Sequence, residues 1–388
     1  MTTLVVTNDF PPRIGGIESF VAHACRFLDD DVAVLTSTAP GADAFDAAAG
    51  FPVERLPGPL LPGPRAASEA VDLLRRTGAD RVLFGAAAPL ALLAPALRAA
   101  GAERIVALTH GHETWWATLP GSRALLRRIG DEVDVLTTIS DYVTDRISAA
   151  LSPAGRAKLV RLPPPVDLDV FRHTAPSSGA PATTIAEIGT EVGAARVVGV
   201  GRMVRRKGFD TLLQAWARLP GPAVRTSSAL GPELVLVGDG PERPRLERQV
   251  RREGIAGVVF TGALDQAGVL AALRRSDVFA LPYRSRLGGL DPEGLGLAAL
   301  EAAACGIPVV VGRSGGAPET VRHGRTGYVV APDDPYELAA RLGDLLSDPQ
   351  HARALGAAGR GLVAERYGAA QARRVLRAAL DLPDVATV

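Results

Sequence analysis

Lysine is almost absent from this sequence: of its 43 basic residues only Lys158 and Lys207 are lysines, and the others are arginines. With so much alanine and glycine, this skew most simply reflects a preference for GC-rich codons, so clusters of arginine are weak indicators of nucleic-acid binding. The net charge of +1 provides no basic field for a polyanion. We therefore expect no nucleic-acid partner, and each lysine that is present becomes conspicuous.

Cysteine and long apolar runs are also scarce. Cys25 and Cys305 are too few for a disulfide framework or a cysteine-based zinc site. No apolar run reaches the ~18–20 residues that span a bilayer. The first residues enter a strand-like segment without the basic and apolar regions of a signal peptide. These absences lead us to expect a soluble, cytoplasmic protein.

What the 388 residues do contain is a regular alternation of short apolar runs and helical stretches. This alternation predicts an α/β architecture with parallel sheets. The runs lie at residues 4–7, 32–36, 81–85, 104–110, 135–140 and 158–167, and again at 196–201, 233–240, 258–262, 278–283 and 307–312. Each group amounts to about five buried strands, which is typical of a Rossmann-like half.

A segment rich in proline, serine and glycine, residues 162–184, predicts the boundary between the two halves. We expect an N-terminal domain over residues 1–168 and a C-terminal domain over residues 169–365. The amphipathic stretch within residues 366–388 is expected to form a helix that returns to the first domain.

The first candidate site is the pair Gly15-Gly16, between a strand and a helix expected to begin near Ile17. Glycines here allow the backbone to approach an anionic ligand, whose charge a helix N-terminus favours. The spacing is not GxGxxG, so it does not predict NAD. A plain strand-to-helix turn is the alternative.

The second candidate site is the segment GRMVRRKGFD, residues 201–210. Arg202 and Lys207 are two cations suited to a diphosphate, whose charge they would neutralise as it leaves. Asp210 is the expected N-cap of the next helix. A solvated basic loop is the alternative, and the rarity of lysine favours the functional interpretation.

The third candidate site lies in GGLDPEGLGLAALEAAACG, residues 288–306. Gly294 and Gly296 allow backbone N–H groups to face a phosphate at the start of a helix. Glu293 and Glu301 can accept hydrogen bonds from sugar hydroxyls. Because Glu301 lies in an almost wholly apolar helix, an unpartnered charge there would be costly, which favours a ligand.

The fourth candidate site is the segment THGHE, residues 109–113, which follows a predicted strand. His110 should lie at the edge of the sheet where open α/β folds bind ligands. His110, His112 and Glu113 could be drawn as a metal site, but no further ligand accompanies them. We expect no metal.

Taken in order, Gly15-Gly16, Arg202-x4-Lys207 and Glu293-x7-Glu301 resemble the retaining GT-B glycosyltransferases of family four. The strings VTNDFPPRIGGIES, LPGSRALLRRIG, GGLDPEGLG and GGAPETV are most similar to the actinobacterial members that transfer mannose from GDP-mannose to phosphatidylinositol monomannoside. This resemblance implies two Rossmann-like domains facing a central cleft, a nucleotide-sugar donor, a phosphoinositide lipid acceptor and no cofactor.

The resemblance also implies a role for each matching residue. Arg202 and Lys207 would bind the diphosphate, and Glu293 would contact the mannose. His110 would face the transferred sugar, with His112 as the alternative for this contact, and Asp9 and His112 would lie towards the acceptor. Donor-binding roles are also implied for Gly15, Gly16, Gly262, Leu264, Gly294, Leu295, Gly296 and Glu301. The implied reaction proceeds with retention, without a protein nucleophile.

Several alternatives stay open at this point. A glycosyltransferase with another nucleotide sugar and a small-molecule acceptor would share every motif. The sequence does not distinguish GDP from UDP. An epimerase or phosphorylase, or a binding module without catalysis, would lack part of the motif set.

A basic amphipathic stretch, residues 122–130, predicts attachment to the inner face of the plasma membrane. Arg123, Arg127 and Arg128 alternate with leucine and isoleucine, a pattern suited to an anionic membrane surface. Leu60 and Leu61, between prolines, are expected to add an apolar contact. An ordinary surface helix with a solvated arginine face is the alternative.

Overall fold

The computed structural model describes residues 2–13, 15–29, 31–171, 195–219 and 231–384. Two compact units divide the chain, one comprising residues 1–165 and 369–388 and the other residues 166–368. These boundaries lie within three residues of the expected ones. Residues 172–184 of the expected boundary segment lie outside the described ranges.

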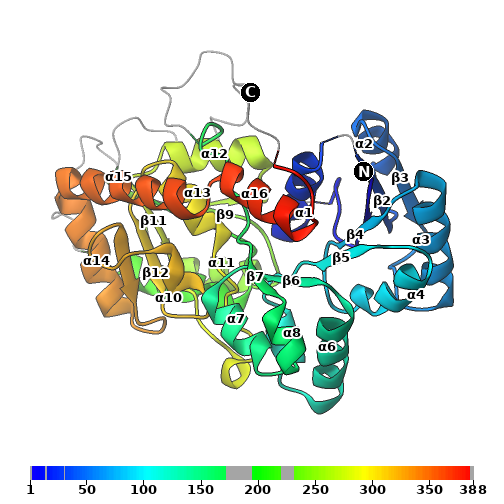
Figure 1. Cartoon of the computed structure of the whole chain (residues 1–388). Helices are drawn as coiled ribbons and strands as arrows, with labels where there is room; N and C mark the ends of the chain where they lie inside the picture. Colours follow the sequence, from blue (N-terminus) through cyan, green and yellow to red (C-terminus); the bar gives the residue numbers. More distant parts are fainter. Residues whose placement is uncertain (1, 14, 30, 172–194, 220–230, 385–388) are drawn as a thin grey trace. The chain divides into compact units, whose positions relative to one another are not determined.

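The first unit is built on a parallel sheet with strand order β3-β2-β1-β4-β5-β6-β7 among the described residues. Its elements, with η denoting a 3-10 helix, are β1 (Thr3–Val6), α1 (Gly16–Phe27), β2 (Val32–Ser37), α2 (Ala42–Ala48), β3 (Val53–Leu56), α3 (Pro64–Thr77), β4 (Arg81–Phe84), η1 (Leu90–Leu93), α4 (Ala94–Ala99), β5 (Arg104–Ala107), α5 (Glu113–Trp116), α6 (Pro120–Glu132), β6 (Val135–Thr138), α7 (Asp141–Ser148), α8 (Pro153–Ala157), β7 (Leu159–Arg161) and α16 (Ala369–Ala379). Because right-handed crossovers run both ways from β1, helices cover both faces. Helices α3, α4 and α6 lie on one face, and α1 packs beside α16 on the other (Figure 1).

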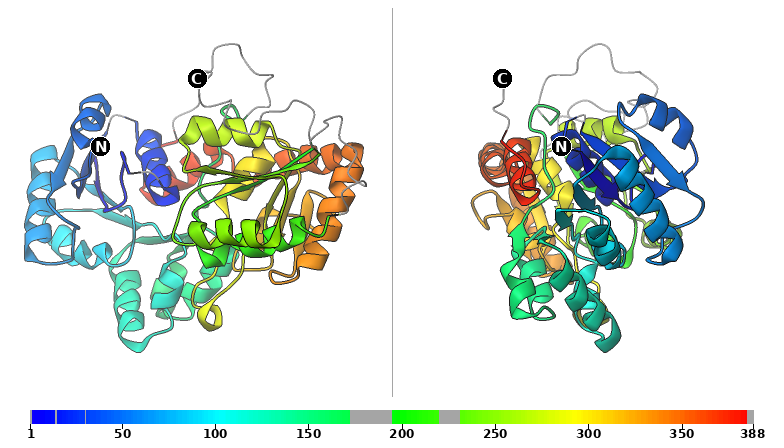
Figure 2. Two further views of the ribbon diagram at one scale, coloured as in Figure 1. Left: turned by 180° about the vertical axis from the view of Figure 1, so that it is seen from behind. Right: turned by 45° about the vertical axis from the view of Figure 1, so that its right-hand side comes forward.

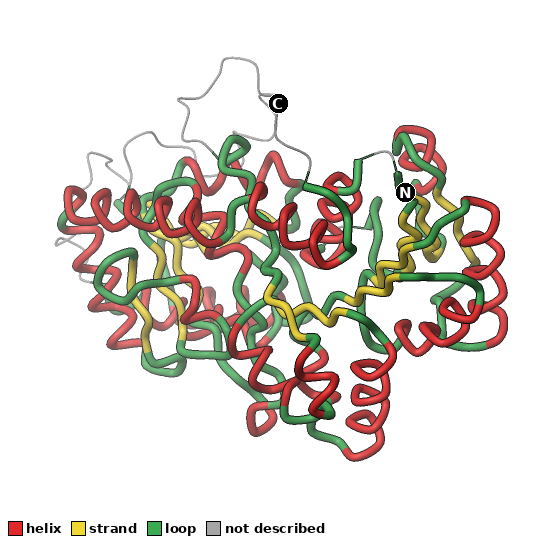
Figure 3. The backbone as a smooth tube through the Cα atoms, viewed as in Figure 1, coloured by secondary structure: helices red, strands yellow, loops and turns green. Residues whose placement is uncertain are grey.

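The second unit has a parallel sheet of order β10-β9-β8-β11-β12-β13 within the part of the chain described. Its elements are β8 (Arg196–Val200), η2 (Arg205–Lys207), α10 (Phe209–Trp216), β9 (Glu233–Val237), α11 (Arg243–Glu253), β10 (Val258–Gly262), α12 (Gln266–Arg274), β11 (Val278–Leu281), η3 (Leu287–Gly289), α13 (Leu297–Ala304), β12 (Val309–Gly312), η4 (Ala317–Thr320), β13 (Gly327–Val330), α14 (Pro335–Ser347) and α15 (Pro349–Arg366). Helices α10 and α14 cover one face of this sheet, and α12, α13 and α15 cover the other (Figure 2). Strands therefore form the centre of each unit, with helices outside (Figure 3).

The strand order shows that, at the middle of each sheet, successive strands change the side on which they are added. In the first unit the chain winds outward from β1 and β4, and in the second from β8 and β11. At such a switch point the loops that follow the two central strands leave in opposite directions, which opens a place for ligands at their carboxyl ends. The candidate segments after β1, β5 and β8 therefore start from the edges where this fold binds its ligands.

Helix α16 secures the end of the chain to the first unit, with which the structure groups it. Arg377 is 6% exposed, and its guanidinium donates to the carbonyl oxygens of Phe27 and Pro383. Arg81 of β4 donates through Nε to the carbonyl oxygen of Leu380 at 2.8 Å. Among the described residues, none of the helices combines the length and apolarity needed to cross a bilayer.

Candidate functional site

Lys207 and Glu293, which are far apart in sequence, form an ion pair at the carboxyl edge of the second sheet. Lys207 Nζ lies 2.9 Å from Glu293 Oε1, and the two side chains are 14% and 10% exposed. Arg206 reaches the other carboxylate oxygen, with Nε 3.7 Å from Oε2. Two cations therefore face one largely buried carboxylate.

The backbone around Glu293 is held by the turn after β12. Its N–H points to Ser314 Oγ at 3.4 Å, and its carbonyl oxygen accepts from the N–H of Gly316 at 2.9 Å. Gly315 has a φ of +55°, and a Cβ at this position would overlap the carbonyl oxygen of Glu293. The glycine is required both by its left-handed backbone and by this close approach.

Glu301 lies in the second turn of α13, whose N-cap is Gly296. Burial raises the pKa of its carboxyl to about 7, and no hydrogen bond to it is formed by the described residues. Leu295 is buried and Gly296 has a φ of +95°. An unpartnered carboxylate close to a glycine-rich helix start is suited to hydroxyl groups of a ligand.

Arg202 extends from the turn after β8 and is exposed, without a hydrogen bond or ion pair from its side chain to the residues described. The turn itself is shaped by the GDG segment after β9. Met203 N–H donates to the carbonyl oxygen of Asp239 at 2.8 Å, and a Cβ on Gly238 or Gly240 would overlap backbone atoms of this turn. The backbone is thus fixed while the guanidinium stays available.

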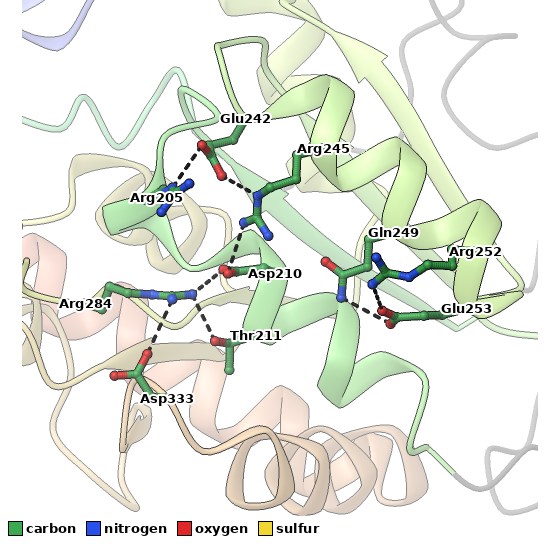
Figure 4. A network of polar contacts seen from close by, with 10 residues as sticks. All are labelled: Arg205, Asp210, Thr211, Glu242, Arg245, Gln249, Arg252, Glu253, Arg284 and Asp333. Carbon is green, nitrogen blue, oxygen red and sulfur yellow. Dashed lines mark hydrogen bonds and ion pairs between the residues drawn. The ribbon is translucent and has the colours of Figure 1, made fainter.

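A network of ion pairs anchors η2, which carries Lys207, to its neighbours (Figure 4). Asp210 accepts from Arg284 and, at 3.1 Å, from Arg245. Arg245 also pairs with Glu242, which in turn accepts from Arg205 at 3.2 Å. Asp210 was expected to be an N-cap, and that prediction is wrong, because Gly208 with a φ of +75° takes this position.

Gly262 ends β10 with a φ of +76°, and its carbonyl oxygen accepts from the N–H of Gly238 at 2.8 Å. Leu264 follows, half-buried, and contacts Gly268 of α12. Asp265 caps that helix by accepting from Gly268 N–H at 2.8 Å. Both expected donor-binding residues therefore lie at the carboxyl edge of the sheet.

In the first unit, His110 follows β5, and its Nε2 lies 2.6 Å from the carbonyl oxygen of Gly85 after β4. Burial lowers the pKa of the ring, opposed by the charge of Glu113. Because a carbonyl oxygen can only accept, Nε2 carries the proton, and in the neutral ring Nδ1 is an acceptor. Nδ1 is thereby able to accept a hydrogen bond from a ligand hydroxyl.

Glu113 fixes this turn, a role that its sequence pattern did not indicate. It is fully buried, and its Oε2 accepts from the N–H groups of His110 and Gly111 at 3.0 and 3.1 Å. His112 Nε2 lies 3.3 Å from Glu113 Oε1, and the two histidine rings are stacked 6.4 Å apart. No group of three or more potential metal ligands is found in the described part of the chain.

Asp9 and Gly15 belong to the loop after β1. The N–H of Asp9 donates to Thr7 Oγ1 at 3.0 Å, and its charge acts on His110. Gly16 begins α1, and the carboxylate of Glu18 lies against Gly15. An anion bound at this helix start would therefore displace a negative side chain, which sequence reasoning did not anticipate.

Comparisons with known proteins match both halves of the chain to glycosyltransferase families. Residues 14–170 match the family "Glycosyltransferase Family 4", and residues 183–362 match "Glycosyl transferases group 1". A protein of Mycobacterium tuberculosis named GDP-mannose-dependent alpha-(1-6)-phosphatidylinositol monomannoside mannosyltransferase is 44% identical over 373 residues, covering 94% of each chain. The chain belongs to the family-four glycosyltransferases.

One further relative supports this family-four glycosyltransferase assignment, and one solved structure supports the fold. The Corynebacterium glutamicum protein named for the monoacylated form of the same acceptor is 41% identical over 362 residues, covering 92% of each chain. The solved structure of Anabaena Alr3699/HepE with UDP and glucose has a TM-score of 0.79 and 17% identity, covering 98% of this chain and 100% of that chain. The latter likeness establishes the GT-B fold.

The residues expected to contact a membrane differ in their exposure to solvent. On α6 of this glycosyltransferase, Arg123, Arg127 and Arg128 are exposed, and Leu125 is 39% exposed beside them. Leu61 is 66% exposed, but Leu60 is 3% exposed because its backbone is held by the side chain of Asn8. The expectation that Leu60 contributes an apolar surface is therefore wrong.

Proposed function

We propose that this glycosyltransferase transfers mannose from GDP-mannose to phosphatidylinositol monomannoside, adding the second mannose of the lipid headgroup. The observation that carries the proposal is identity of 41–46% with relatives named for this reaction, over at least 92% of each chain. A small-molecule acceptor, the alternative from the sequence, is not favoured, because these relatives are all named for the lipid acceptor.

The proposed transfer needs no protein nucleophile, because each bond that forms or breaks involves only the two substrates. The oxygen of the acceptor hydroxyl bonds to the anomeric carbon of mannose as the bond from that carbon to the β-phosphate oxygen breaks. GDP leaves with the electron pair, and one of its phosphate oxygens takes the hydroxyl proton. Because the donor sugar is α-linked and the relatives are named for an α-linkage, the configuration is retained.

The residues at the second sheet would stabilise the departing diphosphate. Lys207 exchanges its ion pair with Glu293 for the phosphate, and Arg202 adds a second cation. Glu293, released from Lys207, then accepts hydrogen bonds from mannose hydroxyls, and Glu301 accepts from the ribose. Gly262 and Leu264 face the base, while the N–H groups of the segment Gly294, Leu295 and Gly296 donate to phosphate oxygens.

The residues of the first unit would bind the transferred mannose, the diphosphate and the acceptor. His110 Nδ1 accepts from a hydroxyl of the transferred mannose, and Gly15 and Gly16 approach the diphosphate once Glu18 has moved. Asp9 and His112 orient the acceptor headgroup. Two protein cations at the leaving group make a metal ion unnecessary.

We also propose that α6 attaches the enzyme to an anionic membrane surface. Arg127 and Arg128 make no ion pair among the described residues, whereas Arg123 donates to the carbonyl oxygen of Ala149 at 2.8 Å. Exposed Leu119 and Leu125 lie on the same helix or at its start. This mixture of basic and apolar groups suits the interface of a bilayer.

Two experiments test these proposals. Purified protein, incubated with GDP-mannose or UDP-sugars and phosphatidylinositol monomannoside, should form the dimannoside by mass spectrometry only with GDP-mannose. Arg127→Ser with Arg128→Ser should weaken binding to phosphatidylinositol vesicles at low salt about 30-fold, since each arginine contributes ~1 kcal/mol near such a surface. The matched control is Arg248→Ser with Arg251→Ser, exposed on α11. Equal binding by both double variants would exclude α6 as the contact.

A further inference from the structure

Tyr283 lies directly beneath the lysine of the candidate site, although no motif marks it. It follows β11 and is fully buried. Lys207 Nζ is 4.8 Å from the centre of its ring, within the range of an attractive contact between a cation and an aromatic face. The edge of the same ring packs against Gly296, where a Cβ would come within 3.3 Å.

The backbones that carry Lys207 and Tyr283 are fastened to each other on both sides of this contact. Arg284, the residue after Tyr283, donates its N–H to the carbonyl oxygen of Arg206, the residue before Lys207, at 2.8 Å. On the other side, a Cβ on Gly208 would overlap the carbonyl of Pro282. The two side chains therefore face each other from adjoining, fixed backbones.

The surroundings of the ring explain why its position is so closely defined. Gly312 of β12 lies so close to the carbonyl of Tyr283 that a Cβ on this glycine would overlap it. The side chain of Arg284 continues into the ion-pair network of Figure 4 through Asp210 and Thr211. A ring fixed by these neighbours can restrain the lysine side chain that lies over it.

The hydroxyl of Tyr283 is buried without a hydrogen bond from the described residues. Burial, together with the charges of Glu293 and Glu301, raises the pKa of the phenol well above its usual value, so the phenol is neutral. Leaving a buried hydroxyl unpaired is unfavourable. The hydroxyl therefore does not explain why a tyrosine occupies this position, and the aromatic ring is the part of the side chain that makes favourable contacts.

We propose that Tyr283 is a positioning residue: its ring face holds the ammonium group of Lys207 at the place from which it meets the diphosphate. Glu293 alone would keep Lys207 in the resting protein but would compete with the phosphate for it. The ring supplies attraction without a formal negative charge, so it restrains Lys207 both before and after the phosphate binds. This inference rests on the proposed role of Lys207.

The test compares Tyr283→Leu, which removes the ring, with Tyr283→Phe, which keeps the ring face. We expect Tyr283→Leu to lower kcat about 10- to 30-fold, because a desolvated contact of this kind is lost. The KM for the lipid acceptor should not change, and Tyr283→Phe should recover most of the lost rate. Tyr336→Leu is the matched control, because it removes an exposed tyrosine from a similar contact with Arg218 at 4.7 Å.

A double-mutant cycle separates positioning of Lys207 from a general structural effect. In the background of Lys207→Ala, Tyr283→Leu should cause no further loss of residual transfer. A loss as large as in the wild-type background, or a Tyr283→Phe variant as slow as Tyr283→Leu, would overturn the inference. If Tyr283→Leu does not fold, Tyr283→Met provides the same comparison with greater side-chain volume. Full activity of Lys207→Ala alone would instead refute the proposed role of Lys207.

Discussion

Replacing Lys207 by alanine should separate its catalytic contribution from its structural one. In the free protein Lys207 Nζ is 2.9 Å from Glu293 Oε1, in a pair that is 14% and 10% exposed. A preorganised group that meets developing charge typically contributes 10²–10³ in rate, or ~3–4 kcal/mol. We therefore expect Lys207→Ala to lower kcat by about that factor.

The same substitution leaves the carboxylate of Glu293 without its nearest cation. Breaking a buried pair costs up to ~3–5 kcal/mol. Arg206, with Nε 3.7 Å from Glu293 Oε2, offsets part of this cost. We expect a loss of about 1–3 kcal/mol, which lowers the Tm by about 2–12 °C in a domain of this size.

A second substitution distinguishes the two effects. Lys207→Ala combined with Glu293→Gln removes the unpaired charge, so the Tm measured by calorimetry should recover while transfer measured by mass spectrometry stays low. Lys207→Arg should also be slow, because the planar guanidinium does not fit between Gly201 and Tyr283 as a compact ammonium does. Recovery of activity in the double variant, or near-normal activity of Lys207→Arg, would refute the reasoning.

Four further measurements test the roles assigned to the charged residues and to Gly315. Burial raises the pKa of the Glu301 carboxyl to about 7, and in its proposed role the ionised form is the stronger acceptor for ribose hydroxyls. GDP-mannose should therefore bind more weakly at pH 6 than at pH 8, by up to about tenfold, and Glu301→Gln should abolish this dependence. The same raised pKa makes the free protein less stable as pH rises from 4.5 towards 7, because the folded state holds the extra proton. Transfer should persist in excess EDTA, and a strict requirement for Mg²⁺ or Mn²⁺ would contradict the roles of Arg202 and Lys207. Gly315→Ala should lower transfer and should lower the free energy of unfolding by about 1–3 kcal/mol. Gly324→Ala should have a smaller effect, because Gly324 has a similar φ of +72° but open space around it.

The sequence predicted the sheets better at their centres than at their edges. Buried runs of valine and leucine identified β1, β4, β8 and β11, because strands covered on both faces are continuously apolar. Strands β3 and β13 were not expected. β3 has the sequence VERL, whose two charged residues on a half-buried edge strand interrupt the apolar pattern. β13 begins at a glycine, which is uncommon in strands.

The sequence indicated which residues belong to the candidate site more readily than it indicated the contacts between them. Motif spacing located Glu293 and Lys207 but not the ion pair between them, because that pair joins loops 86 residues apart. Glu113 and Tyr283 carry no local signal, since their roles come from the backbone and side chains that fold around them. Leu60 and Leu61 are indistinguishable by pattern, and a single amide of Asn8 decides which is buried.

The return of α16 means that the first unit is assembled from two separate stretches of the chain. Residues 166–368 can be cut out as one continuous piece, whereas residues 1–165 alone would lack the helix that packs on α1. Such a fragment would expose the apolar surface that Leu376 and Leu380 now cover, and would leave Arg81 without the carbonyl oxygen of Leu380. An isolated first unit would therefore need a redesigned gene, in which a short linker joins residues 369–384 either ahead of residue 2, as a permutation, or behind residue 165, in place of the second unit.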